Sequence, residues 1–207
     1  VDILEDALSA ISFNSREALC LGLGSPSSSA NASAQLAFLI EMSDCLKVDR
    51  SKVSVYDPVF TADDLLIFDG LKIRVLTENR ACSCFVFKGE YPLDTPTFCF
   101  MPHCDMELYE SLLRANWAPE RLCNLFLVAN HLKDYLDSNP THTLETRVPC
   151  LLRLAPLLEF KQLPASKSRQ TAFNNTSAQY LSSKAPLLEE WFTEESKSKS
   201  PALSETE

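Results

Sequence analysis

The sequence is poor in glycine and in basic residues, and it lacks any long uncharged apolar run. Only four of its 207 residues are glycine, which excludes collagen-like repeats. No segment approaches the ~18 apolar residues that cross a bilayer, and no basic stretch precedes an apolar one at the start. We therefore expect a soluble protein of the cytoplasm, the nucleus or both that does not bind membranes.

Acidic side chains outnumber basic ones by 28 to 19, so the formal net charge is -9. Proteins that bind a phosphate backbone present a broad cationic face, and this composition argues against direct nucleic-acid binding. Hydrophobic residues make up 45% of the chain, which is enough for a sizeable globular core. The expected partners are other proteins or a small ligand, and the sequence identifies neither.

Several catalytic and metal-binding signatures are missing. There is no G-x-S-x-G elbow and no P-loop lysine. Several of the eight cysteines lie in apolar runs, as Cys20 and Cys99 do, and we expect most of the eight to be reduced thiols that pack in the core. Cys82 and Cys84 form a C-x-C pair without the second spaced pair of a structural zinc site, so no metal is predicted. No cofactor is identified.

Short apolar runs alternate with segments of helical period, which is typical of βαβ units. The pattern predicts a Rossmann-like, three-layer α/β domain with a mostly parallel central sheet. We expect strands at 17–23, 52–56, 72–76, 97–101 and 122–129, with a further edge strand at 85–87. Helices are expected after Ser29 and at 61–68, 106–117, 130–136 and 148–158, the last interrupted at Pro156.

The composition changes near the end of the chain. Residues 193–207 are acidic and rich in serine, with almost no large apolar side chain. Such a segment cannot bury enough surface to offset the entropy lost on ordering. We therefore predict one α/β domain over residues 1–192 and a disordered tail over 193–207.

Gly22 and Gly24 stand between a predicted strand and a predicted helix, where a nucleoside-binding domain places glycines so that its backbone approaches the ligand. The motif is partial, because Ser27 takes the place of the third glycine and Pro26 removes an N–H donor. A tight strand-to-helix turn is the simpler explanation. Ser25 fits either account, as a capping residue or as a hydroxyl donor to a ligand.

Asp57 follows the second predicted strand, at a position where an acidic residue can accept hydrogen bonds from ribose hydroxyls. Asp57 before Pro58 also makes a good turn, so both interpretations stay open. Because parallel strands end at one edge of the sheet, we expect Asp57 to lie near the glycines.

The fourth predicted strand is followed by His103, Cys104 and Asp105, which should lie at the same edge of the sheet as Gly24 and Asp57. His103 is a candidate proton donor, and a thiol at a helix N-terminus such as that of Cys104 should have a lowered pKa. The alternative makes Asp105 a helix cap and His103 a turn residue. Asn130 follows the fifth strand and either completes the edge or caps a helix.

Taken in order, these motifs resemble the sensitivity-to-red-light-reduced (SRR-like) domain family. The resemblance is carried over residues 16–136 by LGLGS at 21–25, YDPVF at 56–60, FMPHC at 100–104 and LYESLLRANW at 108–117, and AFNNT at 172–176 is similar to the closing motif of the family.

The resemblance implies a regulatory protein, since family members are linked to light signalling and the circadian clock in plants and to clock-gene expression and heme biosynthesis in animals. It implies no particular reaction. The residues alone leave a second hypothesis open, which is an enzyme of the nucleoside-cofactor-dependent transferase type. Whether the chain is an enzyme is not decided by the sequence.

Overall fold

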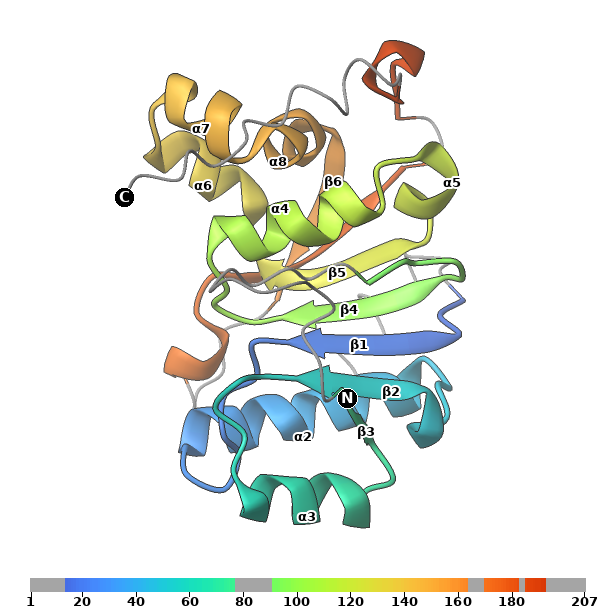
Figure 1. Ribbon diagram of the computed structural model, residues 1–207, viewed down its shortest axis with the longest axis vertical. Helices are drawn as coiled ribbons and strands as arrows, with labels where there is room; N and C mark the ends of the chain where they lie inside the picture. Colours follow the sequence, from blue (N-terminus) through green and yellow to red (C-terminus); the bar gives the residue numbers. More distant parts are fainter. Residues whose placement is uncertain (1–13, 77–90, 164–169, 183–184, 193–207) are drawn as a thin grey trace, which may run out of the picture.

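A seven-stranded sheet forms the centre of the molecule (Figure 1). The computed structural model describes residues 14–76, 91–163, 170–182 and 185–192. The strand order is β3-β2-β1-β4-β5-β7-β6, and all neighbouring pairs from β3 to β5 are parallel. The strands are β1 (Glu17–Leu21), β2 (Val53–Tyr56), β3 (Arg74–Val75), β4 (Thr97–Met101), β5 (Leu125–Asn130), β6 (Leu158–Gln162) and β7 (Thr176–Leu181). The predicted three-layer α/β fold is confirmed, and the order β3-β2-β1-β4-β5 is that of doubly wound sheets.

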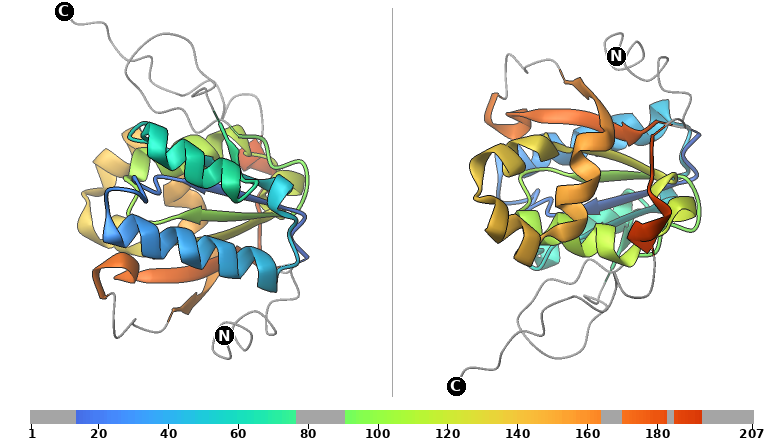
Figure 2. Two further views of the ribbon diagram at one scale, coloured as in Figure 1. Left: turned by 90° about the horizontal axis from the view of Figure 1, so that it is seen from below. Right: turned by 90° about the horizontal axis from the view of Figure 1, so that it is seen from above.

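The central strands are buried on both faces because successive side chains alternate between two cores. In β1, Ala18 and Cys20 pack in the core beneath α2 (Ala30–Cys45) and α3 (Ala62–Gly70). Leu19 and Leu21 pack in the other core, against α4 (Met106–Ala115) and α8 (Pro149–Leu154). Figure 2 shows α2 and α4 on opposite sides of the sheet.

The connections change sides between β1 and β4. The helix that follows β1 is α2, and the helix that follows β4 is α4, so neighbouring strands send their chains to opposite faces. In open α/β sheets the crevice at this switch point, outside the carboxyl ends of the strands, is where ligands bind. A ligand site is therefore expected in the crevice at the carboxyl ends of β1 and β4.

The second half of the sheet differs from the prediction. An antiparallel pair, β7 with β6, extends the sheet beyond β5, and neither strand was predicted. A helix was predicted at 148–158, but the α-helix in this segment, α8, ends at Leu154. A 3-10 turn follows at Ala155–Leu157, and β6 begins at Leu158. Pro156 explains this end, since proline has no N–H to continue the helix.

Smaller differences concern element ends. The predicted strand at 122–129 starts only at Leu125, because Pro119 opens a short helix, α5 (Pro119–Leu122). The predicted helix at 130–136 is α6 (Leu132–Ser138), and the unpredicted α7 (Thr141–Arg147) follows it. The predicted edge strand at 85–87, Cys82, Cys84 and the tail at 193–207 lie outside the described residues.

The described residues contain neither a helix suited to cross a membrane nor a cluster suited to bind a metal ion. None of their helices combines the length and apolar character needed to cross a membrane. No group of three or more histidine, cysteine, aspartate or glutamate side chains among them is arranged to hold a metal ion. The buried thiols of Cys20, Cys99 and Cys150 pack in the two cores, as predicted.

Candidate functional site

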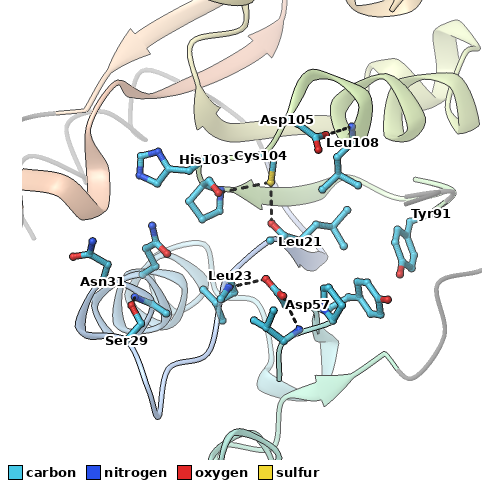
Figure 3. Close-up of a pocket in the computed structure, with 18 residues that line it drawn as sticks. Leu21, Leu23, Ser29, Asn31, Asp57, Tyr91, His103, Cys104, Asp105 and Leu108 are labelled. Atoms are coloured by element: carbon cyan, nitrogen blue, oxygen red, sulfur yellow. Dashed lines mark hydrogen bonds between the residues drawn. The ribbon is translucent and has the colours of Figure 1, made fainter. Parts of the chain in front are cut away.

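A cavity of about 490 Å³ opens at the switch point, between the loops that follow β1, β2 and β4 (Figure 3). Five of the seven predicted site residues line it: Gly22, Gly24, Asp57, His103 and Cys104. Ser25 and Asn130 are not among the lining residues. The remaining lining residues come from the end of β1 and its glycine turn, the first turns of α2, the end of β2 and the loop after it, the segment before β4, and the start of α4. They include Leu21, Leu23, Ser29, Asn31, Gln35, Tyr56, Val59, Tyr91, Asp105 and Leu108.

The glycine turn after β1 needs both of its glycines. Gly22 and Gly24 have φ angles of 73° and 75°, and this backbone conformation is strained for any residue that has a side chain. A Cβ atom on Gly22 would lie 2.6 Å from Cys104 Sγ, and one on Gly24 would lie 3.3 Å from the Cβ of Ala32. The turn therefore lets the β1 loop approach both the β4 loop and α2 closely.

Asp57 joins the β2 loop to the glycine turn. Its Oδ2 atom accepts a hydrogen bond of 2.7 Å from the Gly24 backbone N–H, and its Oδ1 atom accepts one of 3.0 Å from the Val59 N–H. The turn interpretation of Asp57 is thus correct in its geometry. Asp57 also lines the cavity and is only half-buried, and a carboxylate has about four lone-pair sites, so each oxygen can accept a further hydrogen bond.

A second carboxylate, Asp64, holds the serine loop that follows. Its Oδ1 atom accepts a hydrogen bond of 2.8 Å from the Ser27 N–H, and its Oδ2 atom accepts the Thr61 N–H at 2.8 Å. Burial of Asp64 opposes ionisation, but hydrogen bonds from Thr61, Ser25 and Ser27 hold its pKa well below the ordinary value. Ser25 therefore belongs to this cluster, with its hydroxyl 3.2 Å from that of Ser27.

The sequence indicated only part of this arrangement. Thr61 and Asp64 form the capping box at the N-terminus of α3, and the predicted helix start at Thr61 is confirmed. The hydrogen bond that the Ser27 N–H donates to Asp64 joins residues 37 positions apart, and no local sequence pattern indicates it. Ser29 caps α2, where its hydroxyl accepts the Ala32 N–H.

His103 holds a strained conformation at the edge of the cavity. Its φ of 53° is unusual for a residue other than glycine, and such strain is frequent at functional sites. The His103 N–H donates to Asn130 Oδ1 at 3.2 Å, and its Nε2 atom lies 3.2 Å from the Ala172 carbonyl oxygen. That ring contact requires a proton on Nε2.

Asn130 acts on the site through His103. It is the last residue of β5 and does not cap α6, whose N-cap residue is His131. The cap interpretation of Asn130 is therefore wrong, because its amide turns toward the β4 loop. Its Nδ2 atom also donates to the Tyr135 hydroxyl, at 3.3 Å.

The expected reactivity of Cys104 is also wrong. Its side chain is buried, and its thiol lies 3.4 Å from the Leu21 carbonyl oxygen and near that of Pro102. Burial raises the pKa of the Cys104 thiol far above the ordinary value, and the nearby Asp105 and Asp57 raise it further. Desolvation thus outweighs the nearby helix N-terminus, and Cys104 is a packing residue under Gly22. Asp105 caps α4 by accepting the Leu108 N–H at 2.8 Å.

Two tyrosines, the buried Tyr109 and the half-buried Tyr135, hold the loop after β4 in place. The Tyr135 hydroxyl donates to the Cys104 carbonyl oxygen at 2.7 Å, and the Tyr109 hydroxyl donates to that of Met101 at 2.8 Å. Their rings pack with centroids 5.6 Å apart. Sequence reasoning missed both, because each interaction depends on how α4 and α6 fold back over the loop.

The charge of the cavity is negative. Asp57 and Asp105 contribute carboxylates and His103 an imidazole, while none of the described lining residues is lysine or arginine. Apolar and aromatic side chains make up much of the remaining wall. The site therefore offers hydrogen-bond acceptors for hydroxyl or ammonium groups beside apolar surface, and its described lining contains none of the cationic side chains that hold phosphates.

Comparison with known proteins identifies one family. A family model described as the SRR1 domain matches residues 4–180. An SRR1-like protein of Mus musculus is 30% identical over 137 residues, which cover 66% of this chain and 53% of the mouse protein. The protein SENSITIVITY TO RED LIGHT REDUCED 1 of Arabidopsis thaliana is 32% identical over 114 residues, which cover 55% of this chain and 39% of the Arabidopsis protein.

An SRR1-like protein of Drosophila melanogaster is 29% identical over 133 residues, which cover 63% of this chain and 44% of the fly protein. The chain thus spans about half, or less, of the length of these relatives. No solved structure matches it. The motifs read in the sequence, from the glycine turn to the closing AFNNT, all fall within the matched residues 4–180.

Proposed function

The chain belongs to the SRR1 domain family, and we propose that it is a regulatory protein whose action depends on a small ligand bound in the cavity between the β1, β2 and β4 loops. The observation that carries this proposal is the meeting of the glycine turn, Asp57 and His103 at the switch point of a doubly wound sheet, where such folds bind ligands. Family resemblance supplies the regulatory role, and the cavity supplies a means of controlling it.

For the biological process, we propose the regulation of light- and clock-dependent gene expression and of heme biosynthesis, in the cytoplasm, the nucleus or both. Support comes from the family resemblance and from the name of the Arabidopsis thaliana relative, which refers to sensitivity to red light. Unidentified protein partners would transmit the signal. Residues 1–192 would act as one domain.

The test combines binding and a cellular readout. Thermal unfolding of the purified chain is followed with nucleosides, nucleotides, S-adenosylmethionine, nicotinamide dinucleotides and heme. Cells lacking the protein then receive the wild type, Asp57→Asn or a control, Asp63→Asn, and clock-gene transcripts and heme content are measured. Asp63 is exposed, lies on α3 and does not line the cavity.

We expect at least one ligand to raise the melting temperature, and we expect Asp57→Asn to abolish both that rise and the cellular rescue. The Asp63→Asn variant should behave as the wild type. Equal rescue by Asp57→Asn, in a protein that is shown to be folded, would contradict control through the cavity.

A nucleoside-cofactor-dependent transferase is the second candidate, favoured by the acidic residue after β2 beside a glycine turn. The high pKa of Cys104 removes the thiol among the described lining residues as a nucleophile. The candidate acids or bases that are not carboxylates are then the His103 imidazole and the phenols of Tyr56 and Tyr91. Mass spectrometry of the bound ligand after incubation with cell extract separates the two functions. A chemically changed ligand indicates an enzyme, and an unchanged one indicates a sensor.

A further inference from the structure

Two backbone donors of the loop after β1, the N–H groups of Gly24 and Ser27, are already bound by carboxylates of the protein. In dinucleotide-binding folds the N–H groups of this loop face the phosphates of the ligand. Here the Gly24 N–H donates to Asp57 at 2.7 Å and the Ser27 N–H donates to Asp64 at 2.8 Å. The internal carboxylates therefore occupy the positions that phosphate oxygens would need.

The charges around the loop also disfavour a bound phosphate. Asp57 and Asp105 line the cavity, and no described lining residue is lysine or arginine. A phosphate placed there would face two carboxylates and would lose its hydration without a cationic partner among the described lining residues. The N-terminus of α2 offsets this only in part, because a helix end carries about half an elementary charge.

What the cavity does offer suits the rest of a nucleoside. Its volume of about 490 Å³ lies within the range of small-molecule sites, and its walls include Leu21, Tyr56 and Leu108 for an apolar base. Asp57 keeps unused lone-pair sites that can accept hydrogen bonds from ribose hydroxyls. The carboxylates also favour a positive charge on the ligand.

We propose that the cavity binds a nucleoside without phosphate groups, neutral or positively charged, whose ribose hydroxyls donate hydrogen bonds to Asp57. This inference rests on the proposed function and names its ligand class. A sulfonium or ammonium group attached to the nucleoside fits the same electrostatics, whereas nucleoside mono- and diphosphates and nicotinamide dinucleotides do not.

The experiment is isothermal titration calorimetry of the purified chain with probes that differ in one feature. Each of adenosine, guanosine, cytidine and uridine is compared with its 5′-monophosphate. S-adenosylmethionine is compared with S-adenosylhomocysteine, which lacks the sulfonium charge, and the best ribonucleoside is compared with its 2′- and 3′-deoxy forms.

We expect the best nucleoside to bind about tenfold more tightly than its monophosphate, or better, because the added phosphate faces Asp57 and Asp105. Loss of either ribose hydroxyl should weaken binding by about fivefold or more, since Asp57 then lacks a donor. S-adenosylmethionine should bind more tightly than S-adenosylhomocysteine.

Two variants test the assignment of these effects. Asp105→Asn removes a charge but keeps the helix cap, because asparagine caps helices as well as aspartate does. It should narrow the difference in affinity between the nucleoside and its monophosphate by about threefold. Asp57→Asn should remove the preference for ribose over deoxyribose. The control variant Asp63→Asn should change neither this preference nor the difference in affinity between nucleoside and monophosphate.

The outcomes separate this inference from the function on which it rests. A monophosphate or dinucleotide that binds as tightly as the nucleoside overturns the ligand class and leaves a ligand-controlled cavity in place. Binding of heme alone does the same. If no nucleoside binds, the inference is wrong, and the proposed function itself fails only if Asp57→Asn also rescues cells fully.

Discussion

The carboxylate of Asp57 and the backbone N–H of Gly24, 33 residues apart in the chain, meet in a hydrogen bond of 2.7 Å. This bond ties the end of β2 to the turn after β1, and Asp57 therefore has a structural role beside any role in binding. The two roles predict different consequences of the same substitution, and both can be measured.

Asp57→Asn should lower the free energy of unfolding by about 1–2 kcal/mol, because an amide can accept from only one of the two N–H groups that Asp57 now binds. Urea unfolding of the wild type and the variant measures this loss. Asp63→Asn on the exposed side of α3 is the matched control and should change stability little. An unaltered Asp57→Asn stability would mean that water replaces these hydrogen bonds without cost.

Gly22→Ala should destabilise the protein by about 2–4 kcal/mol, since the new Cβ meets Cys104 Sγ and the residue must keep a positive φ. Cys104→Ala removes the clashing sulfur but not the φ penalty. In a double-mutant cycle, we expect the pair to lose about 1 kcal/mol less than the sum of the single changes. Strict additivity would show that the two residues do not touch in solution.

Glu110 predicts a decrease in stability as the pH rises. Burial raises its pKa above the ordinary 4.5, although hydrogen bonds from the Leu151 and Cys150 N–H groups and the Arg114 charge act in the opposite direction. Between the unfolded and the folded pKa the native state binds more protons, so stability falls with rising pH. The wild type should therefore lose stability relative to Glu110→Gln as the pH increases from 4.5, in urea titrations at several pH values.

Asp64 predicts the opposite dependence. Its folded pKa lies below the ordinary 3.8, so its contribution is fully present above that pH and is lost as the pH falls toward the folded pKa. The advantage of the wild type over Asp64→Asn should shrink in strongly acidic solution. A constant difference across the acid range would show that the Asp64 carboxylate has the same pKa in both states.

The last described residues predict where the chain can be shortened. Trp117 Nε1 donates to the Trp191 carbonyl oxygen at 2.8 Å, and the Trp117 ring contacts the rings of Trp191 and Phe192. Truncation after residue 188 should lower the melting temperature by about 4 °C or more. Truncation after residue 192 should leave it unchanged, because residues 193–207 contain only Ala202 and Leu203 as aliphatic side chains. If the protein truncated after residue 192 melted at a lower temperature than the full chain, the tail would have to pack on the domain.

The sequence by itself determined the fold class and the edge of the sheet at which the candidate site lies. Alternation of apolar runs with helical segments specifies parallel strands, and parallel strands deliver their carboxyl ends to one edge. This was enough to place Gly22, Gly24, Asp57, His103 and Cys104 around one cavity.

Only the tertiary structure decided how these residues act. The low dielectric around Cys104 comes from its neighbours in space, so the composition of its own segment did not predict its high pKa. The hydrogen bonds from the Ser27 N–H to Asp64 and from the Tyr135 hydroxyl to the Cys104 carbonyl join segments 37 and 31 residues apart, and no local pattern encodes them. The insertion of β7 between β5 and β6 was also unpredicted, because periodicity describes which side of a strand is buried and does not name its neighbours.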